Sequence, residues 1–106
     1  MEREMKYLVL LTPAAGKKAE DIAPHMVPEI KAVWESYNNG VLREFYFSAS
    51  PPVVTLIYEV ADEATLHSEL DRLPMIQEHL LDRQVVALGP FVQFQALFDK
   101  SLLGPA

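Results

Sequence analysis

Cysteine is absent from all 106 residues of the chain. Its absence excludes disulfide bonds, thiolate catalysis and thiolate metal sites, and it fits a reducing compartment. The sequence also lacks a run of roughly 20 apolar residues that could cross a membrane. The start MEREMK does not have the basic-then-apolar order of a signal peptide. We therefore expect a soluble, cytoplasmic protein with no membrane partner.

Positive charge is scarce as well. Nine Lys and Arg stand against 15 Asp and Glu, giving a net charge of -6, and there is no basic run. This balance disfavours binding to a phosphate backbone, so no nucleic-acid partner is predicted. His25, His67 and His79 have no partner at metal-ligand spacing, and the sequence has neither a glycine-rich phosphate loop nor a nucleophile elbow. We predict no metal and no cofactor.

Hydrophobic residues, by contrast, make up half of the chain, which is too many for a disordered protein. A chain of this length has room for one domain, residues 1–106, and leaves roughly a third of its unfolded surface wet after folding. Burial against a partner would stabilise such a small domain. We therefore predict that the chain assembles with copies of itself.

Prolines, glycines and apolar spacing divide the first half of the chain. Residues 5–11 have the length of a strand. Apolar residues recur at helical spacing between 17 and 39, and the two prolines predict a short turn near 17–23 before a main helix that begins around 25–28. Asn38-Asn39-Gly40 ends it. The residues of its one apolar face are Ile22, Met26, Ile30, Val33, Trp34 and Tyr37.

The second half of the chain begins with strands at 41–48 and 53–60, joined across Pro51-Pro52. Asp62 is the predicted N-cap of a helix that Pro74 stops near Leu73, and 75–81 forms another helical turn. The last strand covers 83–94 with a break at Gly89-Pro90, and 91–98 continues it as an extended arm. The order is βαββαβ, the ferredoxin-like α+β plan, with both helices on one face of an antiparallel sheet.

Strand alternation predicts two different sheet faces. In 53–60, one set faces the helices (Val54, Leu56, Tyr58, Val60) and the other faces away (Val53, Thr55, Ile57, Glu59). In 41–48, the two sets are Val41, Arg43, Phe45 and Phe47 against Leu42, Glu44, Tyr46 and Ser48. The outer face mixes apolar, polar and aromatic residues, as is typical of a sheet closed against a second sheet around a small cavity.

Several motifs resemble one enzyme family. They are Gly40 and Arg43, then Val60 before Asp62, Leu66-His67, Leu70, Leu73-Pro74 and a strand at 85–88. Together these motifs resemble muconolactone isomerase, of the dimeric α+β barrel superfamily. The chain has Glu44 where that family has histidine, and Tyr46 where it has tryptophan. The resemblance implies a homodimer or higher homo-oligomer whose sheets close into a barrel. It also implies a cofactor-free enzyme that isomerises a lactone or another small aromatic-derived metabolite by proton transfer.

Such a reaction needs a base whose pKa is raised toward neutrality and a donor for the developing oxyanion. A carboxylate in an apolar cavity meets the first need, so we predict Glu44 or Glu59 as the base and Tyr46 as the donor. Residues predicted to contact the substrate are Arg43, Thr55, Ile57, Trp34 and Tyr7, the last two being core residues otherwise.

Two alternatives stay open. Either glutamate can instead form an ion pair with Arg43 or a lysine at a sheet edge, and Arg43 and Glu44 point to opposite faces unless a bulge intervenes. The protein can also be a non-catalytic dimeric module that binds a ligand, or a stress or regulatory protein, or a cofactor-free monooxygenase or cyclase of the same superfamily.

Overall fold

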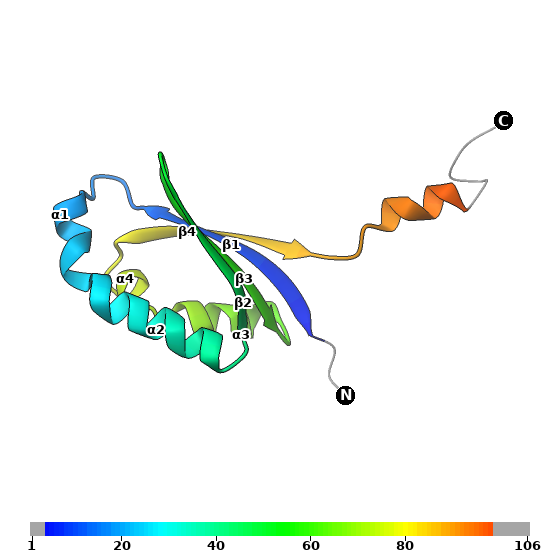
Figure 1. Ribbon diagram of the computed structural model, residues 1–106, viewed down its shortest axis with the longest axis horizontal. Coiled ribbons are helices and arrows are strands. Elements are labelled where there is room, and N and C mark those ends of the chain that lie inside the picture. The colour runs from blue at the N-terminus through cyan, green and yellow to red at the C-terminus, as the bar shows by residue number, and fades with distance from the viewer. Residues whose placement is uncertain (1–3, 99–106) are drawn as a thin grey trace.

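A computed structural model describes residues 4–98 and has an α+β architecture (Figure 1). The elements in chain order are β1 (Met5–Pro13), α1 (Ala19–Ile22), the 3₁₀ helix η1 (Ala23–His25), α2 (Met26–Asn38), β2 (Leu42–Ala49), β3 (Pro52–Val60), α3 (Glu63–Leu70), α4 (Pro74–Gln77), β4 (Leu81–Leu88) and the 3₁₀ helix η2 (Val92–Leu97). The four strands form one sheet in the order β2-β3-β1-β4, and every neighbouring pair is antiparallel.

Helices α1 to α4 lie on one side of the sheet (Figure 1), and the core fills the space between the layers. Strand β3 buries Leu56, Tyr58 and Val60 there, as its alternation predicts. They lie beside the buried residues of the neighbouring strand β1 and share the core with the leucines of α3. Tyr7 pairs with Tyr58 and is buried in this core, so it packs inside the domain.

The prolines act on the first helical segment as predicted. Pro24 lies in η1, between the short α1 and the long α2, and Pro28 lies in the first turn of α2, where a missing N–H costs no hydrogen bond. Gly40 follows α2 with φ +84°, a conformation that other residues rarely adopt. The end predicted at 38–40 is therefore confirmed.

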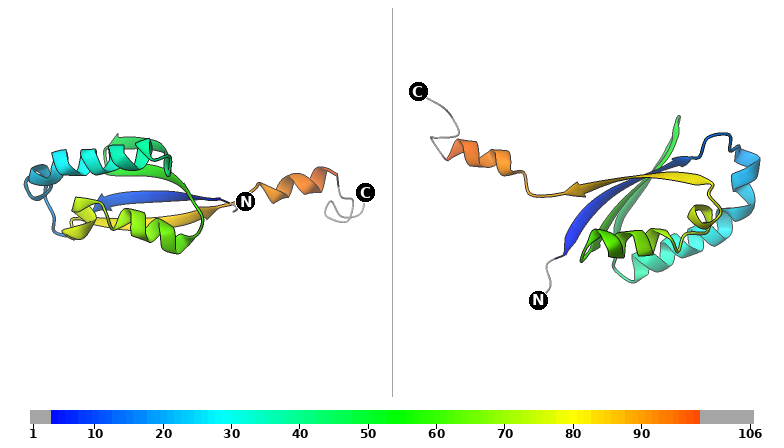
Figure 2. Two further views of the ribbon diagram at one scale, coloured as in Figure 1. Left: turned by 90° about the horizontal axis from the view of Figure 1, so that it is seen from below. Right: turned by 180° about the vertical axis from the view of Figure 1, so that it is seen from behind.

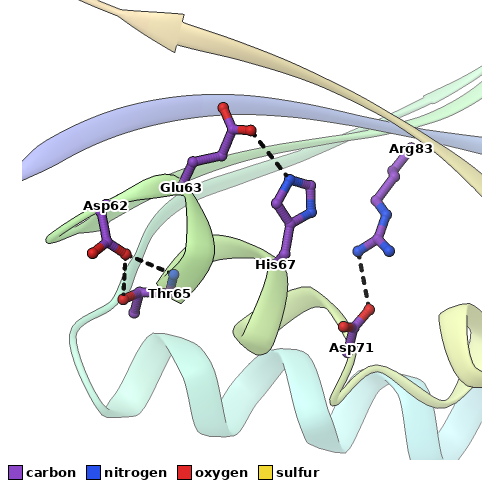
Figure 3. Close-up of polar contacts among 6 residues, drawn as sticks. All are labelled: Asp62, Glu63, Thr65, His67, Asp71 and Arg83. Atoms are coloured by element: carbon purple, nitrogen blue, oxygen red, sulfur yellow. Dashed lines mark hydrogen bonds and ion pairs between the residues drawn. The ribbon is translucent and has the colours of Figure 1, made fainter.

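Asp62 caps α3 as predicted (Figure 3). Its carboxylate accepts hydrogen bonds from the Thr65 backbone N–H at 2.8 Å and from the Thr65 hydroxyl at 2.6 Å. The predicted helix end near Leu73 is wrong by three residues, because α3 ends at Leu70. Pro74 forces an extended ψ of 124° on Leu73 and then begins α4, where a proline is well suited to the first position.

The strand predicted over 83–94 is also wrong beyond Leu88. Strand β4 stops before Gly89-Pro90, because Pro90 has no N–H to donate to a neighbouring strand. The chain then forms η2 instead of an extended arm, and this segment projects away from the sheet and helices (Figures 1 and 2). At its other end β4 begins at Leu81, which was expected to be helical.

The predicted alternation of β2 is wrong at Leu42, because the strand contains a β-bulge. The register shifts between Leu42, which pairs with Tyr58, and Glu44, which pairs with Ile57. The extra residue in β2 puts Leu42 in the core on the helix side. Leu42 therefore shares a face with Phe45 and Phe47, whereas Glu44 and Tyr46 lie on the opposite face.

No helix among the described residues covers that opposite face of the sheet (Figure 1). Leu8 lies at its centre, paired with Ile57 of β3 and Val86 of β4. These side chains are half-buried or exposed. Residues 4–98 thus build one core and leave a second sheet face, of mixed apolar and polar side chains, that none of their helices covers.

Candidate active site

An apolar groove of about 800 Å³ lies on the helix side of the sheet, between α1–α2 and the ends of β1, β2 and β3. Its volume is in the range of small-molecule sites. Apolar side chains form almost all of its wall, among them Leu11, Ile22, Met26, Ile30, Val33, Trp34, Tyr37, Phe45, Phe47 and Val54. The cavity predicted between two sheets requires a second copy of the chain and stays a prediction.

The groove exists because α2 turns a narrow side toward the core. Glu29 and Ser36 are its buried residues, and Ala32 and Val33 pack partly on the core. All six residues of the apolar face predicted from sequence line the groove, and Val33 alone among them also packs on the core. Trp34 is 59% exposed, so this wide stripe is only partly used for folding.

Aromatic rings join the helix wall of the groove to the sheet wall. The Trp34 and Tyr37 ring centroids are 5.7 Å apart, and Tyr37 meets Phe45 of β2 edge to face at 5.1 Å. Such pairs stabilise a fixed arrangement beyond the area they bury. The groove therefore has an aromatic wall that spans α2 and β2.

Glu29 is the acidic residue in the groove wall and is only 8% exposed. Its Oε1 accepts a hydrogen bond from the backbone N–H of Met75 at 2.8 Å. That N–H lies in the first turn of α4, where it has no partner within its own helix. Among residues 4–98 the structure gives Oε2 no hydrogen-bond donor, so this oxygen can accept a proton from a ligand.

Burial raises the pKa of the Glu29 carboxyl above its usual value. The Met75 hydrogen bond and the nearby His25 favour the charged form and offset part of this effect. A carboxylate that is held in an apolar wall with a raised pKa is the expected setting of a general base.

Sequence reasoning did not select Glu29, although the pattern contains a signal. This single acid lies within the apolar face of α2, three residues after Met26 and four before Val33. A charged residue at such a position is rarely buried without a specific partner. The partner, Met75, is 46 residues away in the chain, and only the fold brings the two together.

Two amines also lie in the groove wall. Lys17 and Lys18 lie before α1 and line the groove together with the apolar residues. Their positive charges suit an anionic group on a ligand whose remaining part is apolar. The groove thus has one acid, two amines and an aromatic wall.

The predicted catalytic carboxylates lie elsewhere and form surface pairs. Glu44 accepts a hydrogen bond from the Tyr46 hydroxyl at 2.8 Å, which raises the pKa of Tyr46. Glu59 forms ion pairs with Arg43 at 3.0 Å and with Lys6 at 3.9 Å. The bulge in β2 is what allows Arg43 to reach Glu59. The ion-pair alternative is therefore confirmed for Glu59.

The residues predicted to contact the substrate also lie in different parts of the structure. Trp34 lines the groove from α2. Tyr46 also borders it from the edge strand β2, although its register position is on the opposite face of the sheet. Thr55 and Ile57 lie half-buried on the uncovered sheet face, and Tyr7 is in the core. Of the predicted site residues, the groove brings together only Trp34 and Tyr46.

Histidines and carboxylates elsewhere form ordinary surface pairs (Figure 3). His67 lies 3.6 Å from Glu63 on α3, and Asp71 pairs with Arg83 of β4 at 3.1 Å. Within residues 4–98, no three His, Asp or Glu side chains gather as metal ligands. In this part of the chain no helix is long and apolar enough to cross a membrane.

Comparison of the sequence with known protein families and curated proteins found no relative. No protein-family model matches the chain, and no curated protein sequence is similar enough to count as a relative. The resemblance to muconolactone isomerase therefore stays a prediction from the motifs of the sequence.

Proposed function

We propose that this protein is a cofactor-independent enzyme that moves a proton on a small, largely apolar or aromatic-derived molecule, in the manner of a lactone isomerase. One observation carries the proposal: the carboxyl of Glu29 lies in the wall of an apolar groove, and its pKa is raised by burial. Glu29 replaces Glu44 and Glu59 as the proposed base, because those two are already paired at the surface.

In the proposed reaction, Oε2 of Glu29 takes a proton from carbon next to a carbonyl and returns it to another carbon of the same molecule. Oε1 stays bonded to the Met75 N–H, which fixes the carboxyl in place. The ammonium groups of Lys17 and Lys18 stabilise negative charge on the oxyanion or on a substrate carboxylate. The aromatic wall holds the ring of the substrate.

Glu29→Gln tests the base. The amide oxygen can still accept the Met75 hydrogen bond, but the side chain cannot take a proton, so turnover should fall by roughly 10²–10⁴-fold. The measurement is solvent-deuterium exchange into muconolactone, followed by NMR. Glu59→Gln is the matched control and should keep most of the activity. Equal exchange rates for Glu29→Gln and the parent protein would contradict the proposal.

We further propose that the fold is ferredoxin-like and that two copies close into a dimeric α+β barrel. The βαββαβ order of the long elements and the sheet order β2-β3-β1-β4, with β1 and β3 central, support the first part. The uncovered apolar face around Leu8, Ile57 and Val86 supports the second. A second sheet of the same kind would bury it.

A non-catalytic module that binds a small ligand is the second candidate. The hydrogen bond between Glu29 and Met75 favours it, because this contact also serves as a purely structural link between α2 and α4. The two candidates differ in one result. A binding module would take up muconolactone in the groove, seen as a change in Trp34 fluorescence, without any deuterium exchange.

A further inference from the structure

The segment from Phe91 to Phe98, here called the C-terminal arm, exposes several large apolar side chains. Phe91 and Phe94 are each 62% exposed, and Phe98 is 87% exposed. The arm leaves the sheet after Pro90 and lies away from every other element (Figures 1 and 2). Large exposed apolar side chains gathered in one place mark an interaction site.

The arm is ordered as a short helix with its own internal contacts. Its η2 part has six residues, and the Phe91 and Phe94 rings meet edge to face with centroids 4.9 Å apart. No residue from 91 to 98 carries a charge. An uncharged surface matters here, because two copies of a chain with a net charge of -6 repel each other elsewhere.

The groove offers an apolar surface of matching size. Helix α2 has 13 residues and is therefore about 20 Å long, whereas the six residues of η2 span about 12 Å. Ile30, Trp34 and Phe47 leave more than half of their surface exposed along the open side of the groove. The arm is short enough to lie along that opening.

The arm of one chain is badly placed to reach its own groove. Leu81, at the start of β4, lines the groove, whereas the arm follows Leu88 at the other end of the same strand. The eight residues of β4 separate the two points by about 26 Å. The arm also points away from α1 and α2, which form the helix wall of the groove (Figure 1). A second copy can meet the groove without such a reversal.

We propose that two copies exchange their C-terminal arms, so that Phe91 and Phe94 of each copy cover the groove of the other. The exchange is reciprocal and closes the assembly as a dimer. This inference rests on the proposed function and deepens it: the second copy supplies the side of the site that a single chain leaves open. Covering the groove excludes water from the space beside Glu29, which strengthens the interactions of a bound ligand.

Cross-linking between single-cysteine variants tests the exchange, since the natural chain has no cysteine. Gln93→Cys places a thiol on the arm, and Ile30→Cys places one on the groove wall. A short bis-maleimide should link a mixture of these two chains at micromolar concentration into a mixed dimer. Val27→Cys is the matched control: it lies on the same helix, 77% exposed but outside the groove wall, and should link far less.

Other outcomes would overturn the exchange. Linking of Gln93→Cys mainly to itself would show that arms pair with arms. Internal linking in a chain that carries both cysteines, at a concentration too low for dimers, would show that the arm folds back on its own groove. A dimer by light scattering that gives no mixed link would leave the assembly intact and remove the role of the arm.

A second readout uses Trp34, the single tryptophan of the chain. Raising the protein concentration should shift its emission to shorter wavelength as the arm covers it, and Phe91→Ser/Phe94→Ser should abolish the shift. An unchanged shift in that variant would contradict the exchange. Neither readout depends on turnover, so a mixed link with no deuterium exchange would reject the enzyme and keep the arm.

Discussion

Glu29 is the residue on which the proposed reaction depends. Its environment combines two opposing influences, because burial in an apolar wall disfavours the charged carboxylate whereas the Met75 N–H favours it. Burial is the larger influence, so the pKa rises. The same balance that prepares a carboxyl to take a proton also makes its charged form a cost to folding.

The pH dependence of stability tests this balance. A carboxyl whose pKa is raised in the folded state binds more protons there than in the unfolded chain. The free energy of unfolding should therefore fall as pH rises from the unfolded pKa of Glu29 through its folded pKa. Thermal unfolding of the parent and of Glu29→Gln, compared across pH 4–8, should show the stability of the parent falling relative to that of the variant as pH rises. Parallel curves would contradict a raised pKa.

Glu29→Ala separates the structural part of the role. It leaves the Met75 N–H without its acceptor and should lower the free energy of unfolding by about 1–3 kcal/mol. Glu29→Gln keeps an acceptor and should cost much less at neutral pH. Urea denaturation of the two variants gives the comparison. An equal loss in both would mean that the amide does not replace the carboxylate in the contact with α4.

Among the elements, α2 and α3 show how differently a helix can use its side chains. Helix α3 buries Leu66 and Leu70 in the core and is fixed at its start by Asp62. Helix α2 buries a narrow stripe that includes Glu29 and Ser36, and its apolar face, with Trp34 and Tyr37, lines the groove. We therefore expect stability to depend more on α3 and the proposed ligand binding to depend more on α2.

Asp62→Ala should destabilise α3 by removing the acceptor for two Thr65 hydrogen bonds. The Thr65 hydroxyl, followed by the Thr65 N–H, lowers the pKa of Asp62. A lowered pKa contributes stability that is present above the unfolded pKa and is lost as pH falls through the folded value. The melting temperatures of parent and variant should differ at neutral pH and converge in acid. A constant difference would contradict the role of the charge.

At the scale of the whole molecule, residues 4–98 leave open two surfaces that carry apolar side chains: the outer face of the sheet and the groove beside α2. The proposed dimer covers the first by sheet packing and the second by arm exchange. Both surfaces lie outside the core that the chain builds for itself. A small domain with this much exposed apolar area gains stability from a partner.

Val86→Lys tests the sheet interface. Val86 is 40% exposed on the uncovered face, where it pairs with Leu8, and a lysine there would put an unpaired charge between the two sheets. The dimer dissociation constant should rise at least about tenfold, or ~1.4 kcal/mol, in sedimentation experiments. Val27→Lys on α2 is the control and should leave it unchanged. An unaltered dimer in Val86→Lys would place the interface elsewhere.

Local chemistry made much of the fold predictable. Some residues act only on their neighbours in the chain, so their effects on the helices were predicted correctly from sequence. These residues are Pro24, Pro28, Gly40 and Asp62. Errors arose where two signals competed. At Leu73-Pro74 the proline was interpreted as the end of α3 although it begins α4, and beyond Pro90 the apolar run was interpreted as a strand although it forms η2.

The candidate site was much less predictable, because it depends on contacts between distant residues. The sequence by itself determined the order of the main strands and helices, the boundaries of α2 at its prolines and Gly40, and the apolar stripe of α2. Only the tertiary structure decided that this stripe borders a groove, that Glu29 meets Met75 there, and that a bulge lets Arg43 pair with Glu59. Periodicity tells which residues share a face, but the packing of other elements decides whether that face is filled, left open or paired.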